Sequence, residues 1–115
     1  MAGFNLEPSN NSGILSSAVV TISTAGTAAS PAGVTGTFIR VYKLFLVAGG
    51  VTNLTFADGA TTLAGPLPFA TNGSITLDMD GTPWFSTSKG NAFNIQSSGT
   101  GVTVDGVIYY TQANY

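Results

Sequence analysis

The chain has 115 residues, with no Cys and no His. This composition excludes disulfides and thiolate metal sites, and it removes the side chain that most often serves as general base or metal ligand. Charged residues make up 7% of the chain, against about 25% in an ordinary domain. Because a surface this neutral repels neighbouring molecules weakly, association is favoured.

The same numbers argue against two classes of partner. Three Lys or Arg residues and a formal net charge of −2 provide no basic stripe for phosphate, so we expect no nucleic-acid partner. The longest strictly apolar run, 44–51, has eight residues, whereas a spanning helix needs about 20. We therefore expect no membrane partner.

The first 36 residues differ in composition from the rest. Ser17–Ser23 (SAVVTIS) is a strand candidate, and 24–36 is a low-complexity run of small residues, TAGTAASPAGVTG. Such runs bury little surface to offset the entropy lost on ordering the chain. We predict an extended N-terminal arm with one strand over 1–36, which orders on a neighbouring molecule, and a compact β-sandwich domain over 37–115. The alternative is an ordinary first strand followed by a long loop.

The longest strand candidate follows at Phe38–Val47 (FIRVYKLFLV). Its first half alternates along the chain, which predicts two different faces. Its second half is apolar on both faces, which predicts that both are covered. After the next strand candidate, Val51–Phe56, two prolines interrupt the chain at Pro66 and Pro68. Because proline cannot donate to a ladder, this stretch is predicted to be an edge strand or a loop.

Shorter strand candidates continue to the end of the chain. Ser74–Met79 (SITLDM) alternates strictly, and Ala92–Gln96 places Phe93 and Ile95 inward. The last candidate, Val102–Thr111, contains Gly106, which predicts a bulge. About eight short strands with turn dipeptides between them predict an all-β fold, an antiparallel β-sandwich or jelly-roll.

Candidate chemistry is sparse. Nucleophilic catalysis needs a nucleophile with an activating base, and no motif supplies one, so we expect no catalytic residues and no enzyme activity. Asp78 and Asp80 precede Gly81 in a weak calcium-loop pattern, but the further ligands that such a loop needs are missing. A turn at Asp80-Gly81 is favoured instead, and we expect no metal and no cofactor.

Apolar and aromatic residues are the remaining candidates for function. Tyr109 and Tyr110 are consecutive, so on a strand they point to opposite faces, one into the core and one outward. Tyr and Trp are favoured at interfaces because they bury a large area with a polar tip. For Trp84 a core position is favoured over an interface, and a ligand site has the smallest share. The interface candidates are Val19, Ile22, Trp84, Tyr110 and Tyr115.

Six segments carry a resemblance to known proteins: VYKLFLVAGG at 41–50, NLTFADG at 53–59, GPLP at 65–68, PWFSTS at 83–88, GNAF at 90–93 and GVIYY at 106–110. Together, over about two thirds of the chain, they resemble small bacteriophage virion proteins of the capsid decoration, or cement, type. The resemblance implies a β-sandwich on the capsid surface of the virion, often a homotrimer, that binds the major capsid protein. It carries no catalytic motif and assigns no site residues.

Two functions stay open. The first is a virion structural protein that binds and stabilises the assembled phage head. The alternative is a head- or tail-fibre module that binds host-surface glycans through its aromatic residues and its Asn/Thr-rich surface.

Overall fold

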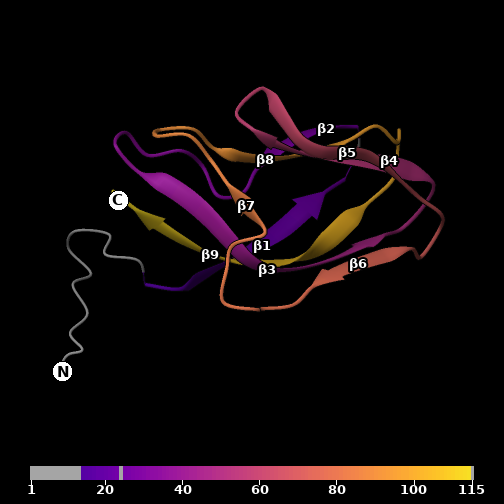
Figure 1. The fold of residues 1–115 in the computed structure, drawn as a ribbon. Coiled ribbons are helices and arrows are strands. Elements are labelled where there is room, and N and C mark those ends of the chain that lie inside the picture. Colours follow the sequence, from indigo (N-terminus) through magenta and orange to yellow (C-terminus); the bar gives the residue numbers. More distant parts are fainter. Residues whose placement is uncertain (1–13, 24, 115) are drawn as a thin grey trace.

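The computed structural model describes residues 14–23 and 25–114 (Figure 1). These residues form nine strands and no helix, and the strands build two antiparallel sheets packed face to face. In this part of the chain no helix is long and apolar enough to cross a membrane. The prediction of an all-β antiparallel sandwich is confirmed, with nine strands in place of about eight.

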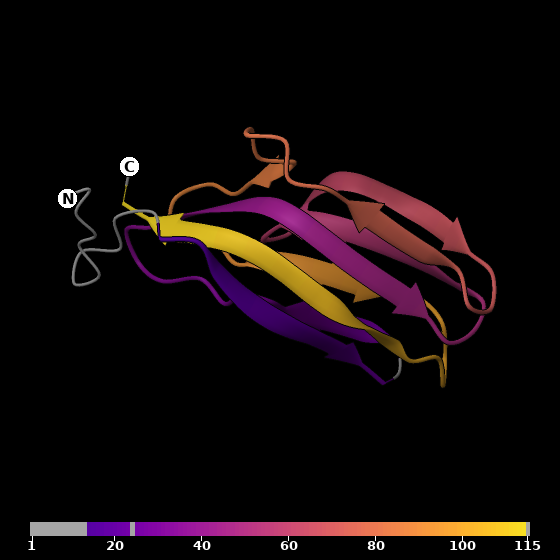
Figure 2. The same ribbon diagram turned by 90° about the horizontal axis from the view of Figure 1, so that it is seen from below.

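Each sheet has one path of four hydrogen-bonded strands. Sheet A has the order β1 (Ser16–Ile22), β9 (Val104–Ala113), β3 (Phe38–Ala48) and β6 (Ser74–Leu77), and the short β7 (Phe85–Ser86) also pairs with β3. Sheet B has the order β2 (Gly26–Ala29), β8 (Phe93–Ser97), β4 (Thr52–Asp58) and β5 (Thr61–Phe69). Figure 2 shows sheet A from its outer side, with sheet B behind it.

The core fills the space between the two sheets. Sheet A contributes fully buried aliphatic side chains, and sheet B contributes Phe56 and Phe93 among others. These two rings form a cluster with Phe85, with centroids 5.1 to 6.0 Å apart; Phe56 stacks on both other rings, and Phe85 and Phe93 are tilted against each other. Aromatic pairs of this kind add about 0.5–1.5 kcal/mol beyond the area they bury. The inward prediction for Phe93 and Ile95 is confirmed.

In the longest strand, β3, a bulge changes which residues face the core. Its register with β9 shifts between Val41 and Lys43, so Tyr42 is the extra residue. Before the bulge the odd-numbered residues face the core, and after it the even-numbered residues do. The prediction that both faces of the second half are covered is therefore wrong, because Phe45 is 42% exposed.

The N-terminal region supplies one edge strand to each sheet. β1 pairs with β9 along its whole length, and β2 pairs with β8. The predicted strand at 17–23 is present as β1, and its residues Val20 and Ile22 belong to the hydrophobic core. The described part of 1–36 is thus a component of the sandwich and not an arm apart from it, because alternate β1 side chains fill the space beside β9. Residues 1–13 lie outside the described residues.

Two further predictions concern the prolines of β5 and the glycine of β9. Pro66 and Pro68 lie on β5, which is an edge strand of sheet B, as their missing N–H groups predicted. The bulge predicted at Gly106 is wrong, because its register with both β1 and β3 is continuous. Glycine is required there for another reason: a Cβ would collide with the carbonyl oxygen of Phe45.

Candidate interaction surfaces

Side chains on the outer face of sheet A form three rows across the strands. Successive residues of a strand alternate between faces, and the register fixes which residues lie abreast. The middle row, which we call the apolar row, consists of Val19, Val107 and Phe45, with Thr76 at its end. One flanking row, the Lys43 row, is Ser17, Tyr109 and Lys43, and the other, the Asp105 row, is Thr21, Asp105, Val47 and Ser74.

The apolar row is open to solvent. Val19 is 77% exposed and Phe45 is 42% exposed, and Val107 lies half-buried between them. Single exposed apolar residues are ordinary, but neighbours on three adjacent strands form a patch, which makes this face a candidate interaction surface. In Figure 2 no described segment crosses in front of β1, β9 and β3. We refer to the three rows together as the sheet A face.

The two flanking rows carry charges of opposite sign. Lys43 and Asp105 lie on opposite sides of the apolar row, on the adjacent strands β3 and β9. The Lys43 ammonium is 5.5 Å from the ring centroid of Tyr109 in the same row, a cation–π contact that keeps the Lys43 side chain on this face. The sheet A face is therefore an apolar stripe with one positive and one negative flank.

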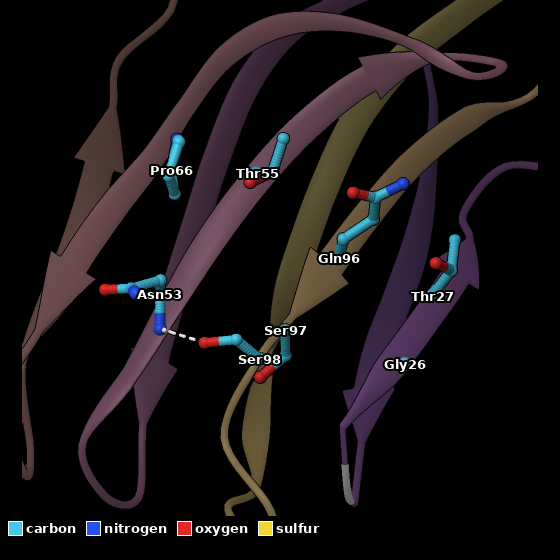
Figure 3. Close-up of a pocket in the computed structure, with 8 residues that line it drawn as sticks. All are labelled: Gly26, Thr27, Asn53, Thr55, Pro66, Gln96, Ser97 and Ser98. Carbon is cyan, nitrogen blue, oxygen red and sulfur yellow. Dashed lines mark hydrogen bonds between the residues drawn. The ribbon is translucent and has the colours of Figure 1, made fainter.

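The outer face of sheet B is hollow and polar. A cleft of about 490 Å³ lies over β2, β8, β4 and β5 (Figure 3). Thr27, Gln96 and Thr55 lie abreast on three of these strands. At one end of the cleft the backbone N–H of Asn53 donates to Ser98 Oγ at 3.1 Å. All eight lining residues are uncharged, so the cleft offers amide and hydroxyl groups for hydrogen bonds.

The carboxylate of Asp58 anchors the loop between β7 and β8. Its Oδ2 accepts hydrogen bonds from the backbone N–H (3.0 Å) and Oγ (2.8 Å) of Ser88, and its Oδ1 accepts one from Asn91 Nδ2 (2.8 Å). Burial raises the pKa of Asp58, but the hydrogen bonds to the charged form outweigh it and the pKa lies below its ordinary value. Because three donors of the same chain satisfy this carboxylate, its role is structural.

The weak metal pattern at Asp78 and Asp80 is a turn in the structure. Asp80 Oδ1 accepts hydrogen bonds from the backbone N–H (3.3 Å) and Oγ1 (3.1 Å) of Thr82, and Gly81 has a φ of 93°. This is the turn interpretation favoured by the sequence. Within 14–23 and 25–114, no group of three or more Asp, Glu, His or Cys residues is placed to hold a metal ion.

The five interface candidates lie in different environments. Val19 is on the sheet A face. Ile22 is 6% exposed and belongs to the core, so the expectation that its side chain meets a partner is corrected: β1 alternates, and Ile22 is on its inward side. Tyr110 packs partly buried against the core. Trp84 is 45% exposed, and its indole N–H donates to a backbone carbonyl, while Tyr115 lies outside the described residues.

Sequence reasoning missed most of the sheet A face. The opposite orientation of Tyr109 and Tyr110 was foreseen, but Tyr109 is the outward one and Tyr110 the inward one. Phe45 was missed because the phase of β3 depends on its bulge, and Val107 was missed because it begins an apolar run with no polar alternation. The run VIYY at 107–110 was the signal that could have identified this face, because four consecutive apolar residues on a strand put two side chains on each side.

Comparison with protein-family models, with curated proteins and with solved structures found no match for this chain. The two outer faces therefore have to be interpreted from their own chemistry. One face presents apolar groups between opposite charges, and the other presents uncharged hydrogen-bonding groups in a hollow. Both arrangements are suited to binding.

Proposed function

We propose that this protein is a virion structural protein of the capsid decoration type, which binds and stabilises the assembled head of a bacteriophage. The observation that carries the proposal is the apolar row of the sheet A face, exposed on a chain with 7% charged residues. Exposed apolar groups on a nearly neutral surface favour burial against a protein partner. The resemblance of 38–111 supplies the partner class, the major capsid protein.

The sandwich is suited to holding neighbouring subunits together. Its core is continuous between the two sheets, and the Asp58 hydrogen bonds fasten one of its loops. A rigid binding partner loses little conformational entropy on association. A protein that binds the assembled shell more tightly than the free subunit stabilises the shell by mass action.

The test is co-sedimentation with assembled heads and, separately, with free major capsid protein of the same virus. We expect the full chain to pellet with assembled heads and to leave the free subunits unbound. The double variant Val19→Thr, Phe45→Thr is expected to bind the heads at least about tenfold more weakly, since it removes two apolar groups of the face. Equal binding of the wild type to heads and free subunits contradicts the proposal.

A second function has one observation in its favour. The cleft of sheet B carries Gln96, Asn53, Thr27 and Thr55, whose amides and hydroxyls can hydrogen-bond sugar hydroxyl groups. None of its lining residues is aromatic, so a bound sugar has no ring to stack on in this part of the structure. Host-glycan binding therefore ranks second. A glycan array separates the two: wild-type binding that Gln96→Ala abolishes supports it, and an array without hits removes it.

A further inference from the structure

We propose that two copies of this chain pack together through their sheet A faces, about a two-fold axis that runs along the apolar row. The proposal deepens the function above and rests on its claim that the sheet A face binds protein. It commits to a second copy as the occupant of this face in the chain that is not bound to a head. The argument depends on where the charges lie relative to the apolar row.

A two-fold axis along the apolar row turns one face onto the other. Each residue of the row then lies opposite its own copy: Val19 against Val19, Val107 against Val107 and Phe45 against Phe45. The same rotation exchanges the two flanking rows, so that the Lys43 row faces the Asp105 row of the second copy. The apolar groups are buried together, as in the face-to-face packing of two sheets with aligned strands.

The rotation also pairs the opposite charges. Lys43 lies on β3 and Asp105 on the neighbouring β9, two residues to either side of the apolar row. After rotation, Lys43 and the Asp105 of the second copy lie at the same level, offset by one strand spacing of about 4.8 Å across the gap of about 10 Å between the two sheets. The Lys43 and Asp105 side chains together span that distance. Because a two-fold interface repeats every contact, this pair forms twice.

A two-fold axis along the strands gives the opposite result. It keeps each flanking row at its own level, so Asp105 would lie one strand spacing from the Asp105 of the second copy. Lys43 would approach its own copy in the same way. Like charges brought together at an interface are unfavourable. The distribution of charge therefore selects the axis along the apolar row.

The size of the face sets the strength of the pair. Three rows about 6.8 Å apart on four strands about 4.8 Å apart give a footprint on the order of 400 Å² for each copy. A stable interface buries about 800 Å² for each partner. The pair is thus weak and concentration-dependent in solution. Because the pair covers the face that binds the assembled head, head binding competes with it by mass action.

The test is sedimentation velocity of the full chain at concentrations from about 10 μM to about 1 mM. We expect a monomer that converts to a dimer as concentration rises. Lys43→Asp alone and Asp105→Lys alone each weaken dimerisation at least about fivefold, because each places like charges together. The double variant Lys43→Asp, Asp105→Lys restores dimerisation, because the pair is re-formed with its signs reversed. Circular dichroism establishes that each variant is folded.

A matched pair of valines tests the apolar row. Val19 is 77% exposed on the sheet A face, and Val51 is 74% exposed between β3 and β4, outside the face. Val19→Thr weakens dimerisation, whereas Val51→Thr leaves it unchanged. Equal effects of the two substitutions would overturn the proposal, as would failure of the charge-reversed double variant to recover.

The outcomes also separate this inference from the proposed function. A chain that is monomeric at every concentration but still binds assembled heads overturns the two-fold pair and leaves capsid binding standing. A dimer that responds to the Lys43 and Asp105 substitutions but does not bind heads does the reverse. The resemblance to decoration proteins implies a trimer, and a trimeric mass unaffected by these substitutions overturns the pair.

Discussion

The two outer faces of the sandwich share one backbone geometry and differ in chemistry. Across sheet A, Val19, Val107 and Phe45 lie abreast, whereas across sheet B the corresponding positions are taken by Thr27, Gln96 and Thr55. Hydroxyl and amide groups are satisfied by water, but apolar groups gain free energy from being covered. In a chain with few charges, the distribution of apolar side chains between the faces is what distinguishes a protein-binding surface from a hydrated one.

The largest effect is expected when a phenylalanine of the core, on sheet B, is replaced, in comparison with an exposed phenylalanine on sheet A. Phe56→Ala removes a fully buried ring and should lower the free energy of unfolding by about 3–5 kcal/mol. Phe45→Ala removes a ring that is 42% exposed and should cost about 1 kcal/mol or less. Urea denaturation measures both. Association should show the reverse order, since Phe45 lies on the proposed binding face. A larger loss of stability for Phe45→Ala would contradict our assignment of the faces.

A second prediction concerns the backbone beneath the sheet A face. Gly106→Ala should destabilise the fold by about 3 kcal/mol, because the added Cβ collides with the Phe45 carbonyl and forces β9 away from β3. The neighbouring substitution Val107→Ala, on the outer side of the same strand, serves as the control and should cost much less. Thermal unfolding measures both, and equal melting temperatures would contradict the close approach of the two strands.

A pH titration tests the loop on the side of sheet B. The pKa of Asp58 is lowered in the folded state, so its charged form is bound more tightly there than in the unfolded chain. Its contribution to stability is complete above the unfolded pKa of about 3.9 and is lost as the pH falls through the folded pKa. The urea midpoint of the wild type should therefore fall more steeply below about pH 4 than that of Asp58→Asn. Parallel pH curves for the wild type and Asp58→Asn would contradict the proposal that the Asp58 carboxylate anchors the loop.

The smallest effect is expected in the cleft of sheet B. Gln96→Ala removes a half-buried side chain that faces the cleft, and it should change the free energy of unfolding by less than about 0.5 kcal/mol. Dimerisation should also be unchanged, because Gln96 lies on the other sheet. Sedimentation velocity of Gln96→Ala and of Val19→Thr at the same concentrations compares the two effects on dimerisation. A loss of dimer in Gln96→Ala would place the self-association surface on sheet B.

The sequence predicted the fold class well because strand and turn signals are local. Alternation at 74–79 and 92–96, and the two prolines on β5, each identify an element without knowledge of the rest of the chain. The first strand was also found. Its place in the sandwich was not, because pairing between β1 and β9 joins the two ends of the chain and has no local signal.

The candidate site was predicted only in part. Val19 was identified, but Phe45 and Lys43 were not, since a single extra residue in β3 reverses which side chains point outward. Ile22 and Tyr110 were placed at an interface although both lie on the inner side of their strands. A one-residue error in register is enough to move a residue from the core to the surface, and sequence alone does not fix the register.

The edges of the two sheets have a consequence for polymerisation. β5 carries Pro66 and Pro68 and has shifts in its register, β2 and β6 have four residues each, and β7 has two. Prolines and short length both prevent an edge from recruiting another strand. Among the edge strands that the structure describes, only β1 offers seven residues without proline or charge. A fibre needs a receptive edge at each end of every subunit, so strand addition through the described edges stops after one step.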